Sequence, residues 1–373
     1  MTLFRVAAIA ALALTLAPAA AVAGPVVTDL AGRTVELPDE IDKVVLGEGR
    51  FLPVLAILET EDPVARIAGM MGEYERLDPD GYALYAERFP ALAEVPRLGL
   101  TTEDSFSLEK AIALGADVAI FGVEGHGPSA RAAETIAALE AAGVVVVFVD
   151  FRQKPLENTG PSIELLGTVL GREERARDFL AFYDAELRRV TEPLAAAGID
   201  RPSVFVDSRV GLSEACCETM GNGMIGEMVS VAGGTNMGTE MLPGVAGTVS
   251  LEYLLTNQPD IYVGTGIGNT RTLSPDSNRI ALGAGIDEAA ARRSLDHSLG
   301  RVGIADLAAV RDGRAHAIWH HFYNTPFHVA AIQQLATWFH PELFADLDPE
   351  ATLATLYERY QPVPLDGTYW VSR

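Results

Sequence analysis

Six side chains with aromatic, imidazole or amide groups gather near the C-terminal end of the sequence. Residues 315–319 have the composition of a buried strand. The side chains at its end are Trp319, His320, His321, Phe322, Tyr323 and Asn324. Imidazole and phenol groups hydrogen-bond or ligate iron, and flat aromatic rings form apolar walls. The segment predicts a binding site for a metal complex, although histidines that only pack in a loop would give the same pattern.

Further polar side chains occupy other segments that follow predicted strands. They are Arg50, Tyr74, Arg76, Glu124, His126, Arg209 and Arg271. Guanidinium groups bind carboxylate, catecholate and hydroxamate oxygens through paired hydrogen bonds. Any single arginine in a loop is as well explained by surface exposure. Together, the four arginines favour a site for an anionic ligand.

A metal would be held at such a site in one of two ways. Direct ligation by His320, His321 or Tyr323 requires a partner from elsewhere, such as Tyr74 or Glu124. A metal that is already enclosed by a small chelator needs no protein ligand. The second interpretation is favoured, and the first stays open.

Alternating short apolar segments and amphipathic segments must position these residues. Strands are predicted at 43–46, 67–70, 117–122 and 144–149, with helical patterns between them. Residues 156–197 carry only helical periodicity, and the alternation resumes at residue 203. Parallel α/β sheets produce this pattern, and their ligands bind beyond the carboxyl ends of the strands. We expect two Rossmann-like α/β lobes, 24–155 and 198–373, bridged by a long helical segment, 156–197, with the ligand cleft between the lobes.

The N-terminal 23 residues have the pattern of a signal peptide. Arg5 precedes an apolar run, 6–16, and Ala21-Val22-Ala23 forms a cleavage site before Gly24. The run is shorter than the roughly 20 residues needed to span a bilayer. We therefore expect residues 1–23 to be removed and the mature protein to be soluble in the periplasm.

The net charge restricts the possible partners, and the cysteines restrict the possible disulfides. The sequence has 51 acidic residues against 28 lysines and arginines, a net charge of −23. This charge repels nucleic acid and anionic lipid, so neither is an expected partner. The only two cysteines, Cys216 and Cys217, are adjacent and cannot join distant segments. They form either a vicinal disulfide or a pair of buried thiols.

Three sets of motifs carry a family resemblance. The chain opens with Asp29-x-x-Gly32-Arg33-x-Val35-x-Leu37-Pro38, and a phrase beginning Ser-Leu-Glu recurs at residues 107–118 and 250–261. Near the end come Leu307-x-x-Val310-x-x-Gly313-Arg314 and Tyr323-Asn324-x-Pro326. With these motifs in this order, the sequence resembles the periplasmic substrate-binding proteins of ABC importers for iron siderophores, haem and cobalamin. The resemblance implies that one exposed glutamate in each lobe, Glu109 and Glu252, docks onto arginines of the permease dimer. Alternatively, each is only an acid that favours the start of a helix.

The expected function is the capture of an iron(III) chelate of the siderophore type and its delivery to the permease. The protein would act as a monomer without a permanently bound cofactor and would meet the membrane only through the permease. Haem, cobalamin, free metal or a metal oxyanion is the alternative cargo. A periplasmic enzyme on the same scaffold is less favoured, because the sequence has no His-Glu-x-x-His, Gly-x-Ser-x-Gly or phosphate-loop motif.

Overall fold

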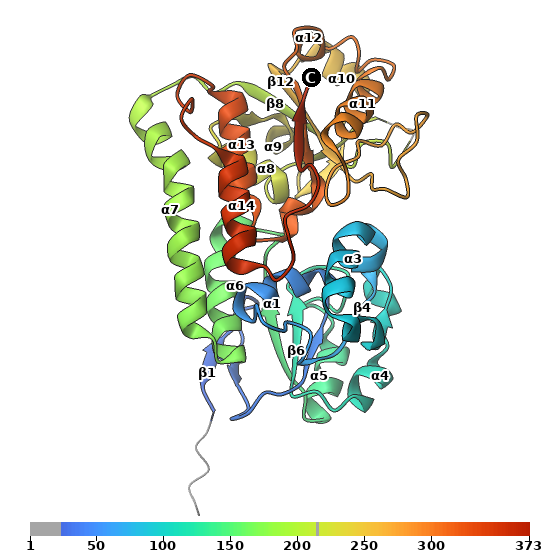
Figure 1. Cartoon of the computed structure of the whole chain (residues 1–373), viewed down its shortest axis with the longest axis vertical. Helices are drawn as coiled ribbons and strands as arrows, with labels where there is room; N and C mark the ends of the chain where they lie inside the picture. The colour runs from blue at the N-terminus through green and yellow to red at the C-terminus, as the bar shows by residue number, and fades with distance from the viewer. Residues whose placement is uncertain (1–23, 214–215) are drawn as a thin grey trace, which may run out of the picture.

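The computed structural model describes residues 24–213 and 216–373, so the predicted signal peptide, 1–23, lies outside the described residues. These residues form two α/β lobes that lie one above the other, with helix α7 along one side of both (Figure 1). The predicted fold class is confirmed.

The N-terminal lobe is built on a five-stranded parallel sheet of order β5-β4-β3-β6-β7. Its strands are β3 (Val44–Leu46), β4 (Ile67–Met71), β5 (Arg97–Gly99), β6 (Val118–Gly122) and β7 (Val145–Val149). Its helices are α1 (Leu52–Leu58), α2 (Glu73–Leu77), α3 (Pro79–Arg88), α4 (Leu108–Ala113) and α5 (Ala133–Ala141). An antiparallel hairpin of β1 (Val26–Thr28) and β2 (Thr34–Glu36) precedes the sheet.

Side chains of this sheet alternate between two apolar layers because successive residues of a strand face opposite sides. In β6, Val118 and Ile120 belong to the main core, whereas Ala119 and Phe121 belong to a smaller core beneath α4 and α5. The main core extends through the bridging helices into the second lobe. The lobes are therefore packed against a common framework.

The C-terminal lobe has a five-stranded sheet of order β10-β8-β12-β13-β14, in which only β14 is antiparallel. Its strands are β8 (Ser203–Asp207), β10 (Thr235–Asn236), β12 (Ile261–Gly266), β13 (Ala315–Trp319) and β14 (Trp370–Ser372). Strands β9 (Glu218–Met220) and β11 (Ala246–Thr248) form a separate antiparallel pair. Its helices are α8 (Met224–Val231), α9 (Met237–Met241), α10 (Leu251–Thr256), α11 (Glu288–Leu299), α12 (Ala308–Arg311), α13 (His328–Phe339) and α14 (Pro349–Tyr360).

Two consecutive helices form the bridge between the lobes. Helix α6 (Pro155–Leu170) ends at Gly171, whose φ of 65° is left-handed, and α7 (Glu173–Ala197) then runs for 25 residues. The turn needs a glycine because other residues adopt this conformation at a cost. Phe179 of α7 is fully buried and packs edge-on against Tyr360 of α14, which fixes the bridge to the C-terminal helix.

Two further findings concern the membrane and the cysteines. None of the helices in the described ranges is both long and apolar enough to cross a membrane. Cys216 and Cys217 are joined in a disulfide, which decides between the two alternatives that the sequence left open.

Candidate functional site

The loops that follow the parallel strands of the two lobes meet at the interface between the lobes. From the N-terminal lobe come the residues after β3, β4, β6 and β7, and from the C-terminal lobe come those after β13. A short 3₁₀ helix, His320–Asn324, follows β13, and all five of its residues are buried. This segment is the one that the sequence marked as the richest in functional groups.

Arg50 is the centre of the contact between the lobes. Its guanidinium is within 2.9 Å of His321 Nδ1 and donates to the Tyr323 hydroxyl at 3.1 Å. His321 Nε2 lies 3.0 Å from the Leu77 carbonyl, to which it can only donate. His321 is therefore the Nε2–H tautomer, and its Nδ1 accepts the hydrogen bond from Arg50.

A second arginine, Arg152, reaches the same phenol oxygen. Its guanidinium donates to the Tyr323 hydroxyl at 3.0 Å and lies 5.1 Å from the centre of the Tyr323 ring. Two guanidinium groups of the N-terminal lobe thus converge on one oxygen atom of the C-terminal lobe. Arg152 follows β7, so the rule that selected Arg50 applies to it as well. The sequence analysis nevertheless missed it.

Glu48 and Glu73 supply the negative charges of the cluster. Glu48 accepts from Asn324 Nδ2 at 2.7 Å and lies 3.5 Å from the Arg152 guanidinium. Glu73 accepts from the Arg50 backbone N–H at 2.9 Å. Gly125 allows the loop after β6 to approach Glu48, because a Cβ at that position would lie 1.9 Å from Glu48 Oε1. Neither carboxylate was among the candidate residues.

The environment of each carboxylate sets its pKa. Burial raises the pKa of Glu48, but the charges of Arg152 and Arg50 outweigh this effect and hold it below its usual range. Burial and the neighbouring Glu48 raise the pKa of Glu73 to about 7. For Arg50, burial lowers the pKa, whereas Tyr323, Glu48 and Glu73 raise it by more, so the guanidinium stays charged.

The three histidines at the interface are neutral at pH 7. Burial lowers the pKa of His126 to about 4 and that of His320 and His321 well below the usual value, and nearby arginines add to the effect. Neutral imidazoles accept as well as donate hydrogen bonds. The cluster therefore combines fixed positive charge with neutral polar groups.

Three buried polar atoms of the cluster have no hydrogen-bond partner within the part of the chain that the structure describes. They are Arg50 Nε, Arg152 Nε and Glu73 Oε2. An unpaired buried polar group is unfavourable by about 1–3 kcal/mol. All three atoms belong to side chains at the lobe interface.

A small cavity of about 40 Å³ lies beside the cluster. Its walls include Arg50, Tyr74, Asp78, Tyr85, Trp319, His321, Tyr357 and Tyr369. Burial raises the pKa of Asp78 to about 6. A cavity of this size accommodates about three water molecules. A larger ligand would enter only if the lobes moved apart.

Eight of the twelve predicted ligand-binding residues lie at or beside the lobe interface. They are Arg50, Tyr74, His126, Trp319, His320, His321, Tyr323 and Asn324. Within the described ranges, the side chains of the other four form no hydrogen bond or ion pair with the cluster around Arg50. Arg76 and Arg271 are exposed, Glu124 pairs with Arg131, and Arg209 pairs with Glu218.

The described residues contain no preformed set of side chains that could ligate a metal directly. Among residues 24–213 and 216–373, no group of three or more His, Cys, Asp or Glu side chains is placed to hold a metal ion. His320 Nδ1 instead lies 3.0 Å from the Thr265 hydroxyl. What the site offers in this arrangement is hydrogen bonding and charge.

The two glutamates predicted to dock lie at the starts of capped helices. Ser107 Oγ accepts from Lys110 N at 3.5 Å at the start of α4, and Ser250 Oγ accepts from Tyr253 N at 3.1 Å at the start of α10. Glu109 and Glu252 are both exposed, one on each lobe. Neither forms an ion pair with any residue in the described ranges.

Comparisons with known proteins agree with this architecture. Residues 102–281 match the family described as periplasmic binding protein. A TroA-like periplasmic binding protein, FepB from Veillonella parvula, is 26% identical and superposes with a TM-score of 0.81, over 93% of this chain and 99% of that one. The molybdate periplasmic binding protein MolA from Haemophilus influenzae is 18% identical, with a TM-score of 0.69 over 92% and 99% of the two chains.

A third similar structure is described as an ABC-type Fe³⁺-hydroxamate transport system from Saccharomonospora viridis. It is 19% identical, with a TM-score of 0.56 over 85% of this chain and 99% of that chain. Among curated proteins, none matches the sequence significantly.

Proposed function

We propose that this chain, which belongs to the periplasmic binding protein family, binds an iron(III) chelate of the siderophore type between its lobes and delivers it to an ABC importer permease. It would do so in the periplasm, as a monomer, after residues 1–23 have been removed as a signal peptide. The observation that carries the proposed cargo is the convergence of Arg50 and Arg152 on the Tyr323 hydroxyl.

Two guanidinium groups directed at one oxygen form a site suited to anionic oxygen atoms. Chelators of iron(III) present carboxylate, catecholate or hydroxamate oxygens, which arginine binds through charge-assisted hydrogen bonds. When the lobes separate, a chelate oxygen would take the place of the Tyr323 hydroxyl between the two arginines. Tyr74 and Trp319 would supply apolar walls for the rest of the ligand.

A metal oxyanion is the second candidate, and the size of the cavity favours it. The cavity beside Arg50 and His321 holds about three water molecules, which is too little space for a siderophore but is on the order of the size of a small anion. An oxyanion would bind with little movement of the lobes. The aromatic walls count against it, because an oxyanion makes no use of apolar surface.

Tryptophan fluorescence tests both candidates, since Trp319 lines the cavity. The purified protein is titrated with ferric siderophores, ferric citrate, haem, cobalamin and molybdate. We expect saturable quenching by one ferric chelate, and an Arg152→Ala variant with its affinity reduced at least about tenfold. Arg131→Ala, which removes an exposed arginine, is the control. Selective binding of molybdate would show that the cargo is an oxyanion and not a ferric chelate. If no compound of the panel bound, the transport proposal would be refuted.

The proposed docking contacts are Glu109 and Glu252. We expect the double variant Glu109→Lys, Glu252→Lys to keep its affinity for the cargo and to lose uptake in cells that lack the wild-type copy. Glu134→Lys with Glu342→Lys is the matched control, because both are exposed, one lies in each lobe and the net charge changes equally. Normal uptake by the first variant would disprove docking through these glutamates.

A further inference from the structure

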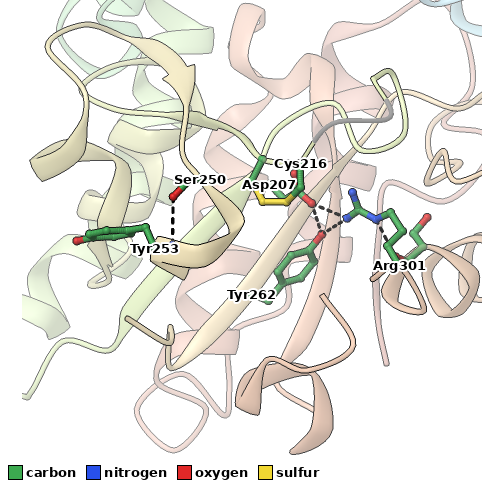
Figure 2. Close-up of a disulfide and its surroundings, with 8 residues drawn as sticks. Asp207, Cys216, Ser250, Tyr253, Tyr262 and Arg301 are labelled. Atoms are coloured by element: carbon green, nitrogen blue, oxygen red, sulfur yellow. Dashed lines mark hydrogen bonds and ion pairs between the residues drawn. A yellow bond between two sulfur atoms is a disulfide. The ribbon is translucent and has the colours of Figure 1, made fainter. Parts of the chain in front are cut away.

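The disulfide between Cys216 and Cys217 lies outside the ligand site, and nothing in the proposed transport cycle uses it. Figure 2 shows it between the start of α10, marked by Ser250 and Tyr253, and a cluster of Asp207, Tyr262 and Arg301. Because these are the only two cysteines of the chain, they have no other cysteine in the chain to pair with. Within the chain, the two cysteines are therefore either joined to each other as a disulfide or present as two thiols.

The two cysteines differ in their exposure to solvent. Cys217 is fully buried, whereas Cys216 is partly exposed and lines a surface hollow of about 700 Å³ together with Asn278, His297 and Val302. Thiol–disulfide exchange begins with attack of a thiolate on an accessible sulfur. A thiol reagent can therefore reach Cys216 from the hollow and would release Cys217 as the leaving group.

The backbone of Cys217 is tied directly to the segment that leads into α10. Cys217 N donates to the Val249 carbonyl at 3.3 Å, and Val249 N donates to the Cys217 carbonyl at 2.9 Å. This pair extends the β9–β11 ladder, in which Thr248 is opposite Glu218. Ser250, the cap of α10, is the next residue after Val249.

Helix α10 depends on this ladder for its position. It has only six residues, and Leu254 is the one that is buried. Helices this short are unstable on their own, and a two-stranded sheet is marginal without support. The disulfide closes a small ring just before the start of β9 and so restricts the backbone that holds the start of the helix.

The cluster of Asp207, Tyr262 and Arg301 on the other side of the disulfide is held by hydrogen bonds that do not involve the sulfurs. Asp207 Oδ2 accepts from the Tyr262 hydroxyl at 2.6 Å and from the Arg301 guanidinium at 2.5 Å. Tyr262 is fully buried in the sheet. Opening the disulfide would therefore loosen the β9–β11 pair and α10 while the main sheet stayed in place.

We propose that Cys216–Cys217 is a redox modification site at which a dithiol reductant loosens the docking helix α10. A thiolate of the reductant attacks Cys216 Sγ, the S–S bond breaks, and Cys217 leaves as a thiolate that takes up a proton. The second thiol of the reductant then resolves the mixed disulfide. Two cysteine thiols and one oxidised reductant result, a two-electron exchange. The link to transport rests on the proposed docking role of Glu252, whereas the loosening itself does not.

Hydrogen exchange of the purified protein, before and after treatment with dithiothreitol, tests the loosening. We expect amides in residues 246–256 to exchange at least about tenfold faster once the disulfide is open, as alkylation of both thiols verifies. Helix α4 is the internal control, because it has the same serine cap and glutamate but no disulfide nearby. Unchanged exchange in α10, or an equal increase in α4, would overturn the proposal.

A variant without the sulfurs, Cys216→Ala with Cys217→Ala, should show the fast exchange without reductant. Should it fail to fold, the reduced wild-type protein carries the test. The variant should bind the cargo as the wild type does and support slower uptake. If α10 exchanges fast in the reduced or cysteine-free protein but the Glu109→Lys, Glu252→Lys variant supports normal uptake, the docking role is refuted and the redox site is not. Unchanged exchange would refute the redox site and leave the proposed function standing.

Discussion

At the scale of single residues, burial and neighbouring charge decide how the lobe interface is held together. Arg50 is 5% exposed and faces Glu48 and Glu73, which are 1% and 0% exposed. A buried charge is tolerated only when it is paired and hydrogen-bonded. The arginine thus has two functions: it neutralises two carboxylates of its own lobe and contacts His321 and Tyr323 of the other.

Removing this charge should destabilise the protein strongly. Arg50→Ala leaves Glu73 without its compensating charge and leaves Glu48 with Arg152 as its cation, so we expect the free energy of unfolding to fall by about 3–5 kcal/mol. Urea unfolding followed by fluorescence measures the loss. Arg76→Ala is the matched control, because Arg76 is exposed, and its effect should stay within about 0.5 kcal/mol. Equal effects of the two substitutions would contradict the role given to Arg50.

Glu73 should make stability depend on pH. Its pKa is raised from 4.5 to about 7, so the folded protein holds the proton more tightly than the unfolded chain does. The resulting stabilisation is complete below the unfolded pKa and is lost as the pH rises through about 7. We therefore expect Glu73→Gln to gain stability relative to the wild type between about pH 5 and pH 8.

Comparing the two proteins at each pH isolates Glu73 from the buried histidines. Burial lowers the pKa of His316 to about 4, so its contribution rises with pH and acts in the opposite direction. Both proteins carry the same histidines, which cancel in the difference. Glu252→Gln, at an exposed carboxylate, is the control. A constant difference between Glu73→Gln and the wild type would show that Glu73 does not titrate in this range.

At the scale of elements, the sequence predicted those segments whose pattern is strong. Strand β13 has the predicted bounds, Ala315–Trp319. The repeated Ser-Leu-Glu phrase marked α4 and α10. Strands β5 and β14 were missed because three residues give too little periodicity, and β14 is held by pairing with distant β13. Helix α3, which begins at Pro79, was missed because its buried residues include glycine, proline and tyrosine rather than an apolar stripe.

The two serine caps should differ in strength. Ser250 Oγ accepts from Tyr253 N at 3.1 Å, whereas the Ser107 bond to Lys110 N is 3.5 Å long. We expect Ser250→Ala to reduce the free energy of unfolding by about 1 kcal/mol and Ser107→Ala by less. Urea unfolding measures both losses, and faster exchange of the Tyr253 amide would locate the first. A larger loss from Ser107→Ala would show that the distances do not report the strength of the caps.

At the scale of the whole molecule, the sequence indicated which loops meet but not how closely. Arg50 and Arg209 both follow strands, and only the first contacts the other lobe. The direction of a side chain depends on the local backbone and on nearby partners, which for Arg209 is Glu218. Neither the backbone conformation nor the partner can be predicted from the fact that a residue follows a strand. For the same reason Glu48, Glu73 and Arg152 were not selected, although each closely follows a strand of the N-terminal sheet.

The lobes also meet on the side of the molecule opposite α7, where α3 approaches the C-terminal lobe (Figure 1). Asp80 accepts from Thr270 N at 2.8 Å and from the Thr270 hydroxyl at 2.6 Å. Because the bridging helices lie along the other side, this contact joins the two lobes on a side that the bridge does not cover. The two hydrogen bonds exist only while the lobes are together, so they favour the closed arrangement.

Breaking this contact should therefore speed the release of the cargo. Each hydrogen bond contributes about 1 kcal/mol, so we expect Asp80→Ala to raise the dissociation rate about fivefold or more. Stopped-flow fluorescence with whichever member of the titration panel binds measures the rate. Asp276→Ala is the control, because Asp276 is exposed in the segment that holds Thr270 and its side chain has no partner within the described ranges. An unchanged rate for Asp80→Ala would mean that the buried cluster around Arg50 alone limits opening, since the same closing movement makes both contacts.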